Sequence, residues 1–260
     1  MIGSPGPLKS CGQKDLADDG TRVYDDVIRS RLDQEYDDWR DPKRTYMVPP
    51  SFKGLSNDTD VGGKAEEKFY NLLQEQGQNN NEPMFVAHSV RFSEHVPGNG
   101  RDRSWVMGES DFVVIHRIHG PIFFQVKATK TGKNYKEAED QIYKDKVALE
   151  NSFKRDVKEN MSTRKAAEPF KNCPGFVVMP NCPRSRLSVR IEDNVLFQDD
   201  CSSSEAFSSW WNEKIESAEH PRLDQKAFEF LVMRQVGPCD SIFIIVDCRY
   251  LSIHSQLNLT

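Results

Sequence analysis

Three polar side chains interrupt two apolar runs in the segment 108–128, which reads GESDFVVIHRIHGPIFFQVKA. Asp111 lies in the first run, and Gln125 and Lys127 lie in the second. Burying an acid, an amide and an ammonium group costs several kcal/mol unless the groups pair or bind an ion. If these three side chains converge, we predict that they form a site for a metal ion and water.

The two runs have the length and the β-branched and aromatic content of strands, and the Gly-Pro pair between them predicts a hairpin turn. Side chains alternate along a strand. Asp111 therefore shares a face with Val113 and Ile115, and Gln125 shares a face with Lys127.

An acid on an earlier helix could join this site. Phe69, Leu72 and Leu73 have the spacing of an amphipathic helix, and Glu66 lies on their side of it. An acid in the first turn also favours the helix dipole, which is a purely structural explanation. That explanation does not account for an acid on the buried side, so we include Glu66 among the candidates.

The order of these pieces resembles a known family. Gly63 with Glu66 on a helix, Gly108 with Asp111 at a strand start, and Gln125-x-Lys127 on the next strand resemble the PD-(D/E)xK nuclease superfamily, and within it the nuclease-related domain (NERD) group. The resemblance covers about residues 62–200. Two positions depart from the family pattern: Ser110 stands where proline is usual, and Gln125 stands where an acid is usual.

The resemblance implies an α/β, restriction-endonuclease-like fold, with a central mixed sheet flanked by helices. It implies a magnesium-dependent (or manganese-dependent) hydrolase that cleaves the phosphodiester bonds of DNA or RNA. Mg²⁺ prefers oxygen ligands, and a divalent ion activates water and offsets phosphate charge. The implied catalytic residues are Glu66, Asp111, Gln125 and Lys127; the implied metal ligands are Glu66, Asp111, Gln125 and the carbonyl of Val126; and the candidate substrate contacts are Gln141, Lys130 and Lys133.

Each site residue also has a structural explanation. Asp111 could bond to a turn, Lys127 could extend from a sheet edge into solvent, and Gln125 could be an ordinary strand amide. The leading alternative function is a nuclease-fold module with weak or no catalysis that binds nucleic acid or a protein partner, because Gln125 is not an acid. A further alternative is an interaction protein that binds a partner through the acidic arm at 20–41.

The length, charge and apolar content of the chain limit which of these functions are possible. The chain has 260 residues, 37% of them apolar, a net charge of −5 and no apolar run long enough to span a membrane. We expect an intracellular protein of the nucleus or cytoplasm, with no signal peptide and its six scattered cysteines as thiols. The acidic balance counts against a generic nucleic-acid binder. However, residues 127–190 carry 15 basic and 8 acidic side chains, which either attract phosphate or solvate a long helix.

We predict three regions: residues 1–60 as a disordered and helical arm with a linker, 61–200 as the nuclease-like core, and 201–260 as a C-terminal αβ extension packed on the core. The expected helices are 24–39, 64–76, 135–157, 205–217 and 224–236. Besides the hairpin, the expected strands are 84–92, 175–180, 187–191, 195–197 and 241–248, with Cys248 as a packing residue. Residues 47–60 are the expected linker and 93–106 an expected mobile loop.

Other motifs are less specific. His116 and His119 flank the hairpin turn, where a solvated pair is more common than a metal site. Trp210 and Trp211 are expected to anchor a helix to the core rather than to stack on bases. No P-loop motif is present, and no local signature of a serine or cysteine nucleophile is found.

Overall fold

The computed structural model describes residues 23–36, 38–41, 43–52, 60–97, 103–160, 170, 173–186, 194–218 and 222–236. Its centre is a six-stranded mixed sheet in which the strands lie in sequence order. The strands are β1 (Tyr46–Val48), β2 (Met84–Pro97), β3 (Arg103–His116), β4 (Gly120–Val126), β5 (Gly175–Val178) and β6 (Val195–Leu196).

The three middle strands form an antiparallel meander, and the outer strands run parallel to their neighbours. β2 pairs with β3 and β3 with β4 in antiparallel fashion, whereas β1 joins β2, β5 joins β4 and β6 joins β5 in parallel. The parallel step from β4 to β5 needs a crossover, which the helix α3 (Tyr135–Asn160) provides.

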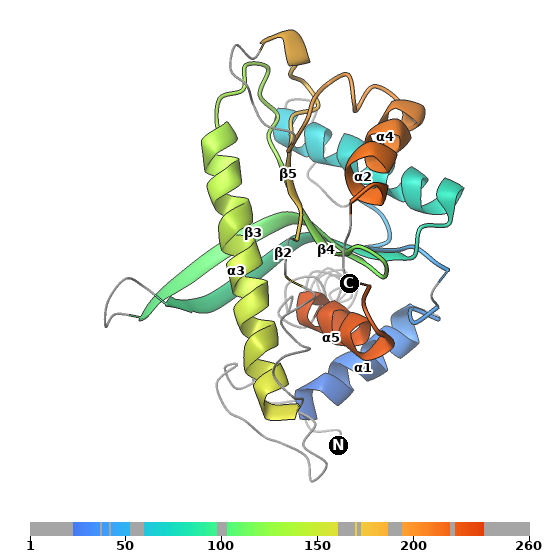
Figure 1. Cartoon of the computed structure of the whole chain (residues 1–260), viewed down its shortest axis with the longest axis vertical. Helices are drawn as coiled ribbons and strands as arrows, with labels where there is room; N and C mark the ends of the chain where they lie inside the picture. Colours follow the sequence, from blue (N-terminus) through green and yellow to red (C-terminus); the bar gives the residue numbers. More distant parts are fainter. Residues whose placement is uncertain are drawn as a thin grey trace, which may run out of the picture.

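Helices cover both faces of the sheet (Figure 1). One face packs against α2 (Val61–Asn80), α4 (Ser204–Trp211) and the following π-helical turn η3 (Asn212–Glu216), around a core that contains Phe69, Phe112 and Phe124. The carboxylate of Asp60 caps α2 by accepting a hydrogen bond from the N–H of Gly63.

The other face packs against α3, α1 (Val23–Glu35) and α5 (Gln225–Val236). Its core joins Ile142 of α3 to Val113 of β3 and Phe123 of β4. A short 3-10 turn, η2 (Arg184–Arg186), follows β5. The coarse prediction of an α/β protein with a helix-flanked mixed sheet is therefore confirmed.

The predicted hairpin is present as β3 and β4, but its turn lies at residues 117–119 rather than at the Gly-Pro pair. Gly120, with φ of 73°, is already the first residue of β4. The two apolar runs alternate between the two cores as predicted: Val113 and Phe123 face α3, and Phe112 and Phe124 face α2.

Two predictions about connecting segments were wrong. Residues 93–97 and 103–106 of the expected mobile loop belong instead to a long ribbon, since β2 runs to Pro97 and β3 starts at Arg103 with the two ends paired (Figure 1). The linker expected from residue 47 begins within β1, whose residues pair with β2. The disorder expected at 1–20 and the strands expected at 187–191 and 241–248, with Cys248, lie outside the described residues.

Candidate functional site

Asp111 lies at the point where β3 and β4 separate. Regular pairing of the two strands ends at Phe112 and Phe124. The Asp111 carboxylate accepts a hydrogen bond from the backbone N–H of Val126, with a distance of 2.7 Å between Oδ2 and N. On the β2 side, Ser89 has a left-handed φ of 54° and is skipped in the pairing with β3, although the register is the same on both sides of it. The Asp111 side chain thus links β3 to β4 at the point where their regular pairing ends.

Groups from both faces of the sheet act on Asp111. Burial raises the pKa of its carboxyl to about 7, and the N–H of Val126 opposes this rise. The nearby carboxylates of Glu66 and Asp145 raise the pKa further, while the ammonium of Lys127 lowers it. Charged side chains from α2, from α3 and from the residue after β4 therefore all act on this one carboxyl group.

Asp145 of α3 is a second buried acid, which the sequence-based argument missed. Its side chain is only 3% exposed, and burial raises its pKa to about 7. Hydrogen bonds from the Ser110 hydroxyl and the Gln141 amide, the latter 2.8 Å from Nε2 to Oδ1, oppose this rise, as does the charge of Lys127. Lys127 therefore acts on Asp111 and Asp145 together.

Gln125 presents an unsatisfied oxygen on the face of the sheet that α3 covers. The residue is 5% exposed and pairs with Val177, which lies in the core beneath α3. Its side-chain Oε1 is buried and has no hydrogen-bond partner. Leaving such an acceptor unpaired costs about 1–3 kcal/mol. An unpaired acceptor of this kind suits a ligand that brings a proton donor or a cation.

Glu66 approaches from the α2 side and is partly exposed. Its Oε2 lies 3.2 Å from Nε2 of His88, a buried ring that packs at a tilt against Phe112. Glu66 and Asp145 thus come from helices on opposite faces of the sheet, and both act electrostatically on Asp111. Sequence reasoning did not identify His88, because a lone histidine in an alternating strand carries no signal of its own.

The remaining predicted residues surround this group. Lys127 directly follows β4, and its backbone N–H donates to the carbonyl of Val178 at 2.8 Å. Lys130 and Lys133 are exposed on the loop that leads from β4 to α3. Gln141 donates to Asp145, so its amide is engaged within the site. Val126 contributes its N–H to Asp111, and the predicted role of its carbonyl remains a prediction.

We call Glu66, Asp111, Gln125, Lys127 and Asp145 the Asp111 cluster. Its potential ligand atoms are carboxylate and amide oxygens, which are the donors that Mg²⁺ and Mn²⁺ prefer. The buried oxygen of Gln125 and the two acids whose pKa values lie near 7 fit a bound divalent cation, because such a cation would stabilise the ionised form of both. The donor types therefore suit a hard metal, although the three acids Glu66, Asp111 and Asp145 do not bring ligand atoms within 4.8 Å of one another.

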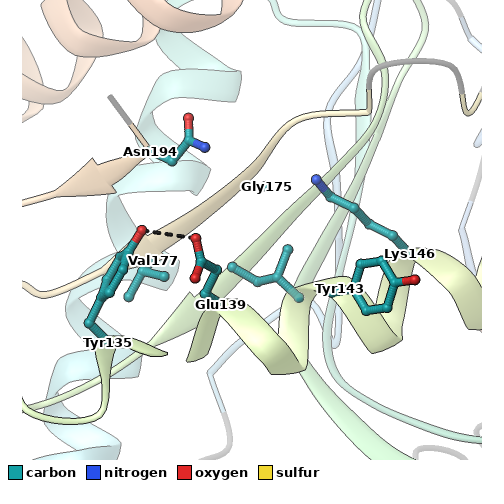
Figure 2. Close-up of a pocket in the computed structure, with 8 residues that line it drawn as sticks. Tyr135, Glu139, Tyr143, Lys146, Gly175, Val177 and Asn194 are labelled. Carbon is teal, nitrogen blue, oxygen red and sulfur yellow. Dashed lines mark hydrogen bonds between the residues drawn. The ribbon is translucent and has the colours of Figure 1, made fainter. Parts of the chain in front are cut away.

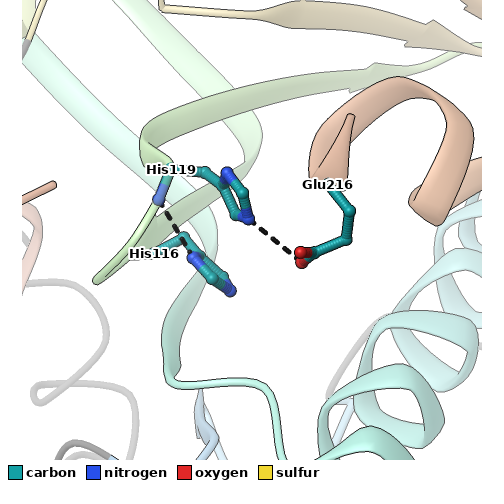
Figure 3. Close-up of side chains that lie close together, drawn as sticks. All are labelled: His116, His119 and Glu216. Carbon is teal, nitrogen blue, oxygen red and sulfur yellow. Dashed lines mark hydrogen bonds and ion pairs between the residues drawn. The ribbon is translucent and has the colours of Figure 1, made fainter. Parts of the chain in front are cut away.

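A second group of metal-type side chains lies at the other end of the β3–β4 hairpin (Figure 3). His116, His119 and Glu216 offer ligand atoms that all lie within 4.8 Å of one another, and by distance this set could hold a metal ion. His119 Nε2 lies 3.0 Å from Glu216 Oε1, and His116 Nε2 lies 3.1 Å from Oε2 of Glu82.

The tautomer of His116 favours a hydrogen-bond network over a metal at this position. Its Nδ1 accepts from the backbone N–H groups of Ile118 and His119 at 3.1 and 3.2 Å, so the ring proton is on Nε2 and is donated to Glu82. Metal-bound histidines instead donate a proton from their second nitrogen. Here a metal on Nε2 would require Nδ1–H to point at two other N–H groups.

A cavity of about 220 Å³ lies between α3 and the β5–β6 end of the sheet (Figure 2). Glu139, Tyr143 and Lys146 line it from α3, and Glu139 accepts a hydrogen bond from the Tyr135 hydroxyl at 3.2 Å. Burial lowers the pKa of Lys146. None of its lining residues belongs to the Asp111 cluster.

Other sequence predictions have clear outcomes. Trp210 and Trp211 are buried among the side chains between α2 and the sheet, as expected for anchors of a helix. In the described part of the chain, no helix has the length and apolar character to cross a membrane. Comparison with protein-family models, curated proteins and solved structures found no significant match to this chain.

Proposed function

We propose that this chain is a metal-dependent nuclease that hydrolyses phosphodiester bonds of DNA or RNA inside the cell. The observation that supports the proposal is the buried Asp111 carboxyl where β3 and β4 separate, because Glu66 and Lys127 both act on it electrostatically and the neighbouring strand carries the unpaired oxygen of Gln125. The order α2, β2, β3, β4, α3, β5 is also the order that the resemblance to PD-(D/E)xK nucleases implies. Free thiols at Cys173, Cys182 and Cys201 support an intracellular setting.

Each residue has a distinct role in this proposal. Asp111 and the Gln125 oxygen would hold Mg²⁺ or Mn²⁺, with Glu66 contributing from α2 directly or through water. When bound, the ion supplies charge to the scissile phosphate and acidity to a water molecule. Lys127, next to both buried acids, orients the attacking water and offsets the negative charge that develops on the phosphate.

A non-catalytic module that binds nucleic acid or a protein partner is the second candidate. The specific observation in its favour is Gln125, because an amide in place of a carboxylate removes one negative charge from the metal site. The acidic arm is less suited to a separate binding role, because Ile28 and Leu32 of α1 are buried in the same core as α5.

A cleavage assay separates these two candidates. The 260-residue chain is incubated with Mg²⁺ or Mn²⁺ and with single-stranded and double-stranded DNA and RNA, beside Asp111→Asn, Lys127→Ala and the exposed control Lys43→Ala. We expect cleavage to fall by roughly 10²-fold or more in the first two variants and to persist in the control. Equal cleavage by all variants would overturn the proposal, and binding without cleavage in the wild type would favour the second candidate.

A further inference from the structure

Asp145 lies on the buried stripe of α3, among residues that otherwise pack against the sheet. Ala138, Ile142 and Leu149 on the same side of the helix are buried in the core that includes Val113 and Phe123. A carboxyl in such a stripe costs several kcal/mol of desolvation unless something compensates it. The Ser110 hydroxyl and the Gln141 amide provide two hydrogen bonds, and Lys127 provides charge without an ion pair within 4 Å among the described residues.

Asp145 could provide the negative charge that Gln125 lacks. Gln125 places a buried oxygen without a partner on the sheet face covered by α3, which is the helix that carries Asp145. The charge of Asp145 also acts on the carboxyl of Asp111. The unpaired amide oxygen and the two carboxyl groups are oxygen donors that together carry two negative charges, and Gln125 and Asp145 lie on the same side of the sheet.

We propose that Asp145 supplies the second carboxylate ligand of the divalent-cation site, in place of the acid that is absent at position 125. This inference rests on the proposed nuclease function only in taking the Asp111 cluster as a metal site. The β3 residue Ser110 has a matching role: its hydroxyl holds the Asp145 carboxylate, which a proline at that position could not do.

The alternative is a structural carboxyl that only joins α3 to β3 through Ser110. Both roles require burial and hydrogen bonds, so loss of cleavage in an Asp145 variant would not separate them. Direct binding of Mn²⁺ does separate them, because it needs no substrate and no turnover. The isosteric change Asp145→Asn keeps the size of the side chain while it removes the negative charge.

Mn²⁺ binding is measured by calorimetry at pH 8 with the full chain. We expect Asp145→Asn to weaken binding by more than about 100-fold, since residues that only support metal ligands cost about 10-fold to 100-fold. The matched control is Asp140→Asn, which makes the same change on the exposed side of α3, where Asp140 pairs with Lys136. Asp140→Asn should bind Mn²⁺ within about twofold of the wild type.

A double variant separates loss of the ligand from misfolding, because a misfolded protein could not regain Mn²⁺ affinity. If charge near position 125 is what the site requires, Gln125→Glu combined with Asp145→Asn should recover most of the lost Mn²⁺ affinity. Normal binding by Asp145→Asn, or a double variant as weak as Asp145→Asn, would overturn the inference. If Asp111→Asn loses Mn²⁺ while Asp145→Asn keeps it, the metal site stands and only this inference is wrong. If both lose Mn²⁺ but the wild type cuts no nucleic acid, the inference stands and the nuclease function is wrong.

Discussion

At the scale of single residues, the two buried acids link stability to pH in an unusual direction. Asp111 and Asp145 have folded-state pKa values of about 7, above the ordinary value of 3.8. The folded protein therefore binds more protons than the unfolded chain between these values, and its stability falls as the pH rises through this range. A bound divalent cation would reverse this loss, because it favours the ionised carboxylates.

We expect Asp145→Asn to be more stable than the wild type at pH 8 when EDTA is present. One pKa unit corresponds to about 1.4 kcal/mol, so the advantage of the variant should grow by roughly 2 to 4 kcal/mol between pH 4 and pH 8. Urea denaturation of both proteins at several pH values measures this difference. A difference that does not change with pH would show that the folded-state pKa of Asp145 is not raised.

The site residues differ in how readily the sequence reveals them. Asp111, Gln125 and Lys127 can be predicted because they interrupt strand-like apolar runs. Asp145 lies among the lysines of a long helix and resembles a residue of its solvated face. The available signal was its spacing from Ile142 and Leu149, which puts it on the buried stripe, and the same spacing argument had already selected Glu66.

At the scale of elements, the position of α3 depends on a close approach to β5 at Gly175. A Cβ atom at this glycine would lie 2.4 Å from Cγ2 of Ile142 and 2.8 Å from Cε of Lys146. Lys146 could move, but Ile142 is held in the core. A side chain at position 175 would therefore push α3, and Asp145 with it, away from the sheet.

Gly175→Ala should lower the free energy of unfolding by about 1–3 kcal/mol and also weaken Mn²⁺ binding. Gly77→Ala is the matched control, because its Cβ would lie 2.4 Å from Thr45 on the other side of the sheet. We expect the control to lose stability but to keep its Mn²⁺ affinity once folded. Urea denaturation and calorimetry measure the two effects, and equal Mn²⁺ affinity in both variants would contradict this role of Gly175.

The helices and apolar strands were predictable, and the paired polar segments were not. α2, α3 and α5 follow the helical spacing of their apolar residues, and β4 and β5 follow their continuous apolar runs. The outer ends of β2 and β3 have a polar, glycine-containing sequence, and their structure comes from pairing with each other. β1 has only three residues and is a strand because β2 offers it an edge.

At the scale of the whole molecule, the N-terminal helix is part of the core. Ile28, Leu32 and Trp39 are buried beside Phe228 and Leu231 of α5, and α1 lies along α5 (Figure 1). Sequence alone left open whether this acidic segment docks on the core or serves a partner. The structure shows that its apolar face is already covered within the chain.

Leu32→Ala should therefore lower the free energy of unfolding by about 2–5 kcal/mol, because Leu32 is fully buried. The exposed neighbour Ser30→Ala should change it by less than about 0.5 kcal/mol. Urea denaturation followed by circular dichroism compares the two variants. Equal stability would mean that α1 can detach from the core without cost.

The charge of the chain is distributed unevenly around the candidate site. The net charge is −5, and the Asp111 cluster itself holds three acids, so a polyanionic substrate needs cationic groups nearby. Lys130 and Lys133 are exposed on the loop between Lys127 and α3, which places them next to the cluster along the chain. Lysines that contact phosphate release counterions, and each contact adds about one unit to the salt dependence of binding.

Replacing both loop lysines with alanine should weaken nucleic-acid binding and lower the slope of log affinity against log salt by about 2. Binding is measured by fluorescence anisotropy in the Asp111→Asn background, so that the labelled DNA or RNA stays intact. Lys43→Ala, an exposed lysine on the N-terminal segment, should leave the slope unchanged. An unchanged slope in the double variant would mean that the phosphates approach the Asp111 cluster from another direction, because only cations in contact with phosphate alter this slope.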